Sequence, residues 1–236
     1  MKKWLMRQDK SMLLECVKRY MDNSEKSIIP EFMVDIVDVL GDGSCRFRAI
    51  ADNINTFKNQ NVSQKRIAEM FYTLIKDTVL NVLPGLTNNE LVSLFGFESL
   101  DPTISPIENI DNHIGYSHSP HINNLREYSK KFKYGTYTTD FEMQILFSKY
   151  LKDYWQSTFD IPTPCVTIYI PSSPNVSSLP INKSFIEISC ANRSAHNFIN
   201  FRLLYVDGDH YQAIYVKPEY SDFNEVILKN GCKITS

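Results

Sequence analysis

The stretch VLGDGSCRFRAI, residues 39–50, connects two different hydrophobic patterns through a Gly-Asp-Gly turn. Before the turn, VDIVDVL (34–40) is a β-branched run of strand length. After the turn, residues 45–57 place apolar side chains on one face at helical spacing, which predicts a helix. Cys45 stands at the junction, at the first position of that helix. A cysteine that only fills a core does not need such a strand–turn–helix setting.

The setting of Cys45 favours a reactive thiol. A free thiol has a pKa of about 8.5 and is mostly protonated at neutral pH, whereas the thiolate is the nucleophile. The positive end of a helix dipole lowers that pKa, and a neighbouring imidazolium does the same. Gly41 and Gly43 allow a sharp turn that exposes backbone N–H groups near the sulfur, where they can bind the oxyanion of a tetrahedral intermediate. Cys45 is therefore a candidate nucleophile that needs a histidine from elsewhere in the chain.

His210 is the histidine best placed to act as the base. The five histidines of the chain are His113, His118, His121, His196 and His210. The runs FRLLYV and HYQAIYV flank Asp207-Gly208 and predict a β-hairpin, with His210 at the start of its second strand. The long sequence separation from Cys45 is no obstacle, because such pairs meet in the fold. The residues alone leave a second interpretation open, in which Cys45 is a small core residue and His210 a turn residue.

The composition excludes several classes of protein. At 236 residues, 43% apolar and 22% charged, the chain fits an ordinary globular domain. A net charge of −2 lacks the basic excess of nucleic-acid-binding proteins, and no apolar run reaches the length of a membrane span or a secretory signal. The five cysteines show no zinc-site spacing, and their odd number argues against a disulfide framework. We therefore expect a cytoplasmic protein with reduced cysteines that binds neither nucleic acid nor membrane.

Periodic patterns cover most of the remaining chain. Helices are predicted at 11–21, 63–83, 87–95 and 139–151, the last two opened by the capping boxes Thr87/Glu90 and Thr139/Glu142. Strands are predicted at 165–170 and 184–188. Residues 96–123, rich in Pro, Asn, Asp and Ser, are predicted to be the longest loop, a lid or binding insertion. The three histidines within it match no zinc spacing, so we expect a solvated loop rather than a metal cluster.

Three stretches of this sequence, around Cys45, at 134–146 and around His210, resemble the ovarian tumour (OTU) family of cysteine proteases. Most members of that family are deubiquitinases. The family signature D-G-x-C-[LGQ]-F-R-A is similar to DGSCRFRA, residues 42–49. A central W-G-x-x-(D/x)-E-x-x-A-L block has a weaker counterpart in Tyr134-Gly135-Thr136 and residues 140–146. A closing H-Y or H-W pair on a strand is matched by His210-Tyr211. The blocks occur in family order across roughly residues 33–217.

The resemblance implies an α/β fold of the papain-like OTU type, with a small mixed β-sheet flanked by helices. It implies that Cys45 is the nucleophile and His210 the general base. It also implies an oxyanion hole made by the backbone of Asp42, Gly43, Ser44 and Cys45. The family works without a metal or an organic cofactor, so none is expected here.

The chain departs from the family pattern at the residue that orients the histidine. Many members carry Asp or Asn two residues after the histidine, where this chain has Gln212. Other members are thought to use the acid of the first block, which is Asp42 here. The third catalytic residue is therefore expected to be Asp42, with Gln212 as the alternative. Arg46 replaces a small or apolar residue, and a contact with substrate is open to it.

The resemblance implies a deubiquitinase that hydrolyses isopeptide or peptide bonds at the C-terminus of ubiquitin through an acyl-enzyme thioester. The expected partners are ubiquitin or polyubiquitin chains, or ubiquitin-like modifiers. A channel for the Gly-Gly tail is expected between the Cys45 loop and residues 96–123 or 171–184. Two alternatives stay open: a protease for a polyprotein or a ubiquitin-like modifier, and a catalytically weak ubiquitin-binding module.

The expected organisation is a single catalytic domain at residues 33–220. Residues 1–32 are expected to form an N-terminal helical extension, and residues 221–236 a tail. The chain is expected to be a monomer, and to work in the cytosol of a host if it is an effector of a pathogen or endosymbiont.

Overall fold

The computed structural model describes residues 34–96, 100–118, 120–170, 184–188, 199–206 and 210–217. The predicted helix at 11–21 and the Asp207-Gly208 turn lie outside the described residues. The predicted N-terminal extension and C-terminal tail lie outside them as well, so the domain boundaries stay predictions.

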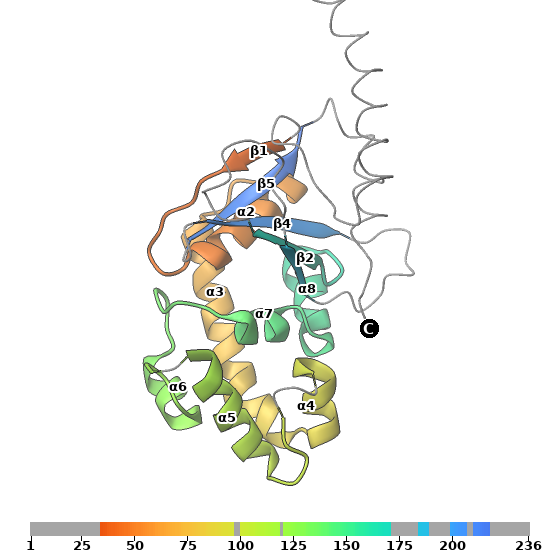
Figure 1. Cartoon of the computed structure of the whole chain (residues 1–236). Helices are drawn as coiled ribbons and strands as arrows, with labels where there is room; N and C mark the ends of the chain where they lie inside the picture. The colour runs from red at the N-terminus through yellow and green to blue at the C-terminus, as the bar shows by residue number, and fades with distance from the viewer. Residues whose placement is uncertain are drawn as a thin grey trace, which may run out of the picture.

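Helices make up most of the described chain. The α-helices are α2 (Cys45–Lys58), α3 (Gln64–Asp77), α4 (Asn88–Phe95), α5 (Pro106–His118), α6 (Leu125–Lys131), α7 (Asp140–Leu146) and α8 (Lys152–Phe159). A π-helical turn and short 3-10 segments extend or join them, at Thr78–Val82, Leu83–Gly85 and Lys149–Leu151. In Figure 1, α2 lies against the sheet, α3 runs away from it, and α4, α5 and α6 gather at the far end.

The strands form a five-stranded mixed sheet in the order β1-β5-β4-β2-β3. They are β1 (Val34–Val37), β2 (Cys165–Ile170), β3 (Ser184–Ile188), β4 (Asn200–Val206) and β5 (His210–Val216). β2 and β4 are parallel, and the other neighbours are antiparallel. The predicted mixed α/β fold with a small sheet and helices is confirmed, and so are the predicted antiparallel strands of the C-terminal hairpin.

The core is built around α2. The predicted apolar face, Phe47, Ile50, Ala51 and Ile54, is completely buried. Phe47 meets Phe71 of α3 edge-on, with ring centroids 5.7 Å apart. Each large apolar side chain buried in this way stabilises the fold by about 1.5–3 kcal/mol. Because α2 packs against both α3 and β5, its first residue is held firmly between the helices and the sheet.

The prediction of a long loop at 96–123 is wrong. Residues 106–118 form α5, and Ile110 and Ile114 are completely buried against the core. The polar composition of the stretch hid the helical pattern. One of its polar side chains is buried and hydrogen-bonded inside the protein. The amide of Asn109 accepts from the Asp101 backbone N–H at 2.8 Å and donates to the Asp101 carbonyl at 2.7 Å. The helices α6 and α8 were not predicted either; each spans only seven or eight residues.

The expectation that the three histidines lie in a solvated loop is wrong for the two on α5. His118 is buried, with Nε2 2.7 Å from Oε1 of Glu142, and the Tyr128 hydroxyl donates to the same oxygen at 2.9 Å. The other carboxylate oxygen of Glu142 accepts from the Thr139 backbone N–H at 2.8 Å, which confirms the predicted capping box. One buried carboxylate therefore ties α5, α6 and α7 together.

Cys165, at the start of β2, is disulfide-bonded. The expectation that the cysteines are reduced is therefore wrong for this residue, because an odd number of cysteines prevents complete pairing but allows a bridge. Among the described residues, no helix is both long enough and apolar enough to cross a membrane.

His113 makes the stability of the fold sensitive to acid. It is 8% exposed, its ring lies 4.7 Å from that of Phe95, and its Nδ1 has no hydrogen-bond partner within the described residues. Burial lowers the pKa of His113 below its usual 6.5. The unfolded chain therefore binds a proton that the folded chain does not, so stability falls as pH drops below about 6.5.

We expect His113→Phe to lose less free energy of unfolding than the wild type when the pH is lowered from about 7.5 to about 5. Urea denaturation at the two pH values measures this. His121→Gln, at an exposed position, should keep the wild-type pH dependence. Equal losses in the wild type and His113→Phe would contradict the assignment.

Candidate active site

Cys45 begins α2, as predicted, and is only 3% exposed. The backbone N–H groups of Cys45 and Arg46 lie close enough to the Cys45 thiol to act on its charge. Burial raises the pKa of the Cys45 thiol, while these N–H groups and the positive charge of Arg46 act in the opposite direction. The resting thiol is therefore protonated at neutral pH and needs a base to become a nucleophile.

The turn before Cys45 is held by the carboxylate of Asp42. Arg48 binds this carboxylate with both Nε, at 3.2 Å, and Nη2, at 2.7 Å. The Tyr134 hydroxyl donates to it at 2.6 Å, and the Ser44 backbone N–H at 3.1 Å. These hydrogen bonds, above all that from Arg48, lower the pKa of Asp42 to about 2. Asp42 is therefore ionised and fully engaged in shaping the turn.

A second contact presses the backbone of the turn against residues 134–136. Gly43 has φ +80°, and a Cβ placed on it would lie 2.3 Å from the Gly135 carbonyl oxygen. The Gly135 N–H donates to the Ser44 hydroxyl oxygen at 3.0 Å. The Tyr72 hydroxyl lies 3.3 Å from the Gly43 carbonyl and hydrogen-bonds to the Thr136 carbonyl. The central sequence block thus meets the first block directly.

His210 begins β5, and its imidazole lies between Asp38 and the turn. Its Nε2 is 2.7 Å from Oδ1 of Asp38. Its Nδ1 faces the turn, since a Cβ placed on Gly41 would lie 3.6 Å from it. The hydrogen bonds from His210 and Gln212 lower the pKa of Asp38, which is therefore ionised at neutral pH. Nδ1 is accordingly the ring nitrogen turned toward the segment that ends in Cys45.

The strand register explains why Asp38 meets His210. β1 and β5 are antiparallel, and Val37 lies opposite Ala213. Continuing this register by one residue places Asp38 opposite Gln212. His210 is two residues from Gln212 and therefore points to the same face, within diagonal reach of Asp38.

Neither of the two expected third residues is hydrogen-bonded to the imidazole. Asp42 binds Arg48 and makes no hydrogen bond to His210, because it is turned toward the start of α2. Gln212 does not bind the imidazole either, since its amide nitrogen donates to Oδ1 of Asp38 at 3.2 Å. Sequence reasoning missed Asp38. The available signal was an acidic residue at the end of a strand that leads into the cysteine turn.

Two backbone N–H groups of the predicted oxyanion hole are hydrogen-bonded within the turn. The Asp42 N–H donates to the Leu40 carbonyl at 3.1 Å, and the Ser44 N–H to the Asp42 carboxylate at 3.1 Å. For Gly43 and Cys45, the role in the oxyanion hole stays a prediction. Arg46, for which a contact with substrate was left open, is 5% exposed and bound to Asp140 in this structure.

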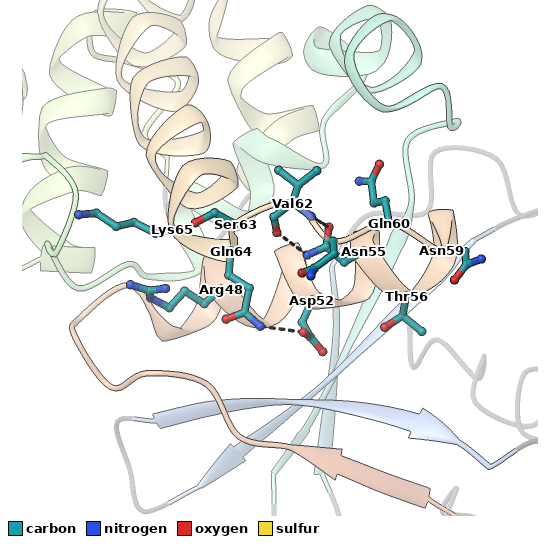
Figure 2. Close-up of a pocket in the computed structure, with 11 residues that line it drawn as sticks. Arg48, Asp52, Asn55, Thr56, Asn59, Gln60, Val62, Ser63, Gln64 and Lys65 are labelled. Carbon is teal, nitrogen blue, oxygen red and sulfur yellow. Dashed lines mark hydrogen bonds between the residues drawn. The ribbon is translucent and has the colours of Figure 1, made fainter.

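A polar pocket of about 600 Å³ lies between the C-terminal part of α2 and the start of α3 (Figure 2). Neither Cys45 nor His210 lines it. Its side chains bind one another: the Gln64 amide donates to Asp52 at 2.7 Å, and the Asn55 amide donates to the Val62 carbonyl at 2.7 Å (Figure 2). This pocket is therefore a seam between two helices, not the candidate site.

A channel for the Gly-Gly tail was expected beside residues 96–123, but a different segment contacts the Cys45 turn. The stretch 96–123 contains α5, which Figure 1 shows at the end of the molecule far from the sheet. The segment in contact with the turn is 134–136. Residues 171–183, the other expected wall, lie outside the described residues. Within the described ranges, no cluster of three or more His, Cys, Asp or Glu side chains is arranged to hold a metal ion.

No protein-family model matches the chain, and no curated protein sequence matches it. Among solved structures, it is similar to a crystal structure of an OTU deubiquitinase from Wolbachia pipientis wMel, with 15% identity and a TM-score of 0.42, covering 86% of this chain and 99% of that chain. A crystal structure of an OTU deubiquitinase from Wolbachia pipientis wMel bound to ubiquitin gives 12% identity and a TM-score of 0.44, covering 78% of this chain and 97% of that chain. Likeness at this level carries no functional argument, so function has to be argued from the motifs and the site.

We expect Gly43→Ala to lower the free energy of unfolding by about 1–3 kcal/mol, because a side chain at positive φ is strained and its Cβ meets a backbone oxygen. It should also displace the turn and slow the reaction of Cys45 with a small alkylating agent. Gly85→Ala is the matched control, because nothing lies within 4 Å of its Cβ. Thermal unfolding and alkylation rates of both variants test this, and a Gly43→Ala variant as stable and as reactive as Gly85→Ala would refute the contact.

Proposed function

We propose that this protein is a cysteine-type deubiquitinase, which hydrolyses isopeptide or peptide bonds at the C-terminal glycine of ubiquitin. The observation that carries the proposal is the assembly of Cys45 at a helix start with a His210–Asp38 pair against the same turn. A thiol, an imidazole and an orienting carboxylate are the groups that thiol-dependent acyl transfer requires.

The reaction proceeds in two halves. His210 Nδ1 takes the proton of the Cys45 thiol, and the thiolate attacks the carbonyl carbon of the terminal glycine. The N–H groups of Gly43 and Cys45 bind the oxyanion that forms. The C–N bond then breaks as the imidazolium returns its proton to the leaving amine, which leaves a thioester. Water, losing a proton to His210, hydrolyses the thioester to a carboxylate and restores the thiol.

Asp38 acts as the positioning residue for His210. A carboxylate on Nε2 holds the imidazole with Nδ1 toward the thiol and stabilises the imidazolium that forms during the reaction. Gln212, which donates to the same carboxylate oxygen, keeps Asp38 in place. The residue two positions after the histidine thus serves the imidazole through Asp38.

The substrate class follows from two observations. Cys45 is almost completely covered, so only a slim tail, such as two glycines without side chains, reaches the sulfur. The sequence blocks at 42–49, 134–146 and 210–211 resemble those of the OTU family, most of whose members act on ubiquitin. Together they favour ubiquitin over a polyprotein as the substrate.

Ubiquitin bearing a C-terminal thiol-reactive electrophile tests this function. We expect a covalent adduct with the wild type, none with Cys45→Ala, and slower formation with His210→Ala, read by mass spectrometry. Cys165 lies in a disulfide, so an adduct on the peptide containing Cys45 identifies the reacting thiol. Failure to form an adduct, together with failure to cleave ubiquitin conjugates, would refute the proposal and leave a protease for another substrate; ubiquitin binding without an adduct would identify a binding module.

We expect Asp38→Ala to lower kcat on a ubiquitin conjugate by at least about tenfold with little change in KM, because the imidazole loses its orienting partner. Asp35→Ala, in the strand that directly precedes Asp38 and also exposed, should retain activity. Asp42→Ala is expected to lower thermal stability, since Asp42 holds the turn. Normal kcat in Asp38→Ala would show that His210 does not depend on this carboxylate.

A further inference from the structure

Arg46 carries a buried charge directly after the candidate nucleophile. Its side chain is 7% exposed. Nη1 donates to Oδ1 of Asp140 at 3.0 Å, Nη2 hydrogen-bonds to the Tyr211 hydroxyl, and Nε has no hydrogen-bond partner in the part of the chain that the structure describes. Burying a guanidinium with incomplete pairing costs free energy. Such a cost points to a use for the charge at this place.

The counter-charge of Arg46 is far more exposed than Arg46 itself. The Asp140 side chain is 51% exposed, against 7% for Arg46. Water screens the field of an exposed carboxylate more strongly than that of a buried guanidinium. The pair therefore does not cancel at the start of α2, and a positive potential remains where Cys45 lies.

The other titratable groups around Cys45 do not remove this potential. They are Asp42, Tyr72, Tyr137 and His210. The carboxylate of Asp42, which acts against the thiolate, is paired with its own cation, Arg48. The two tyrosines are neutral at physiological pH because burial raises the pKa of each. Of the two arginines, Arg46 has the more exposed anionic partner, since the Asp140 side chain is 51% exposed, against 25% for Asp42.

Arg46 also joins the element that carries the cysteine to the element that carries the histidine. Its guanidinium carbon lies 4.3 Å from the centroid of the Tyr211 ring, and Tyr211 follows His210 in β5. The charge is thus fixed between the start of α2 and the start of β5.

We propose that Arg46 is a positioning residue whose charge stabilises the Cys45 thiolate, and that Asp140 limits the size of this effect. The proposal deepens the function proposed above and depends on it only in taking Cys45 as the reacting thiol. It predicts opposite effects from removing the two charges: loss of Arg46 disfavours the thiolate, and loss of Asp140 favours it.

The test is the pH profile of alkylation of Cys45 by iodoacetamide, followed by mass spectrometry of the peptide that contains it. We expect Arg46→Gln to move the midpoint of the profile to higher pH and to slow alkylation severalfold at neutral pH. Asp140→Asn should move the midpoint to lower pH and speed alkylation severalfold. Arg46→Lys, which keeps the charge, should restore most of the shift.

Lys58 and Asp160 provide a matched control, because they form an exposed pair at the other end of α2. Lys58→Gln and Asp160→Asn remove the same charges and should leave the profile unchanged. If Arg46 acted only through structure, Arg46→Gln and Asp140→Asn would move the midpoint of the profile in the same direction, or would only have lower thermal stability. Either result would overturn the proposal. Since Asp140 is half-exposed, its variant decides the question even if Arg46→Gln fails to fold.

The result of this experiment is independent of the test of the proposed function, because alkylation by iodoacetamide requires no ubiquitin. An adduct with the ubiquitin probe but unchanged profiles would overturn the role of Arg46 and leave the deubiquitinase standing. Opposite shifts without a ubiquitin adduct would support the role of Arg46 and overturn the substrate.

Discussion

β1 pairs with β5 over only four residues, from Val34 opposite Val216 to Val37 opposite Ala213, and the chain then leaves the sheet toward α2. This short antiparallel pairing positions the whole candidate site. It aligns Asp38 with the start of β5, where His210 begins the strand, and it delivers residues 41–44 to the start of α2. A slip of one residue would turn Asp38 to the opposite face of the sheet and away from the imidazole.

The cysteine side of the site is held by different forces from the histidine side. A bidentate ion pair between Asp42 and Arg48, with Tyr134 on the same carboxylate, fixes the turn through charge. The approach of Gly43 to Gly135 fixes it through the absence of side chains. The histidine side has no such buried support, because the Asp38 side chain is 73% exposed. Cys45 is therefore rigidly placed, whereas the imidazole depends on hydrogen bonds at the surface.

Features that depend on neighbouring residues were predictable from the sequence. The start of α2 at Cys45, the capping boxes and the antiparallel β4–β5 strands belong to this kind. Features that depend on which segments meet were not. Asp42 was expected to orient His210 because of the family pattern, but its carboxylate binds Arg48, which lies six residues further on. α5 was missed because its polar residues hid the apolar spacing, and one of them, Asn109, is hydrogen-bonded inside the protein.

The placement of Asp38 at the margin of the sheet has a consequence for how the protein loses its reactivity. Among the strands that the structure describes, β1 lies at the edge of the sheet and pairs with β5 alone. Short edge strands fray at a lower free energy than that of global unfolding, whereas α2 is packed on both sides and opens only with the core. Fraying of β1 separates Asp38 from His210 while Cys45 stays in place. Hydrogen exchange should therefore be faster at the amides of β1 than at those of α2. In mild denaturant, the site should lose its reactivity before the protein unfolds globally.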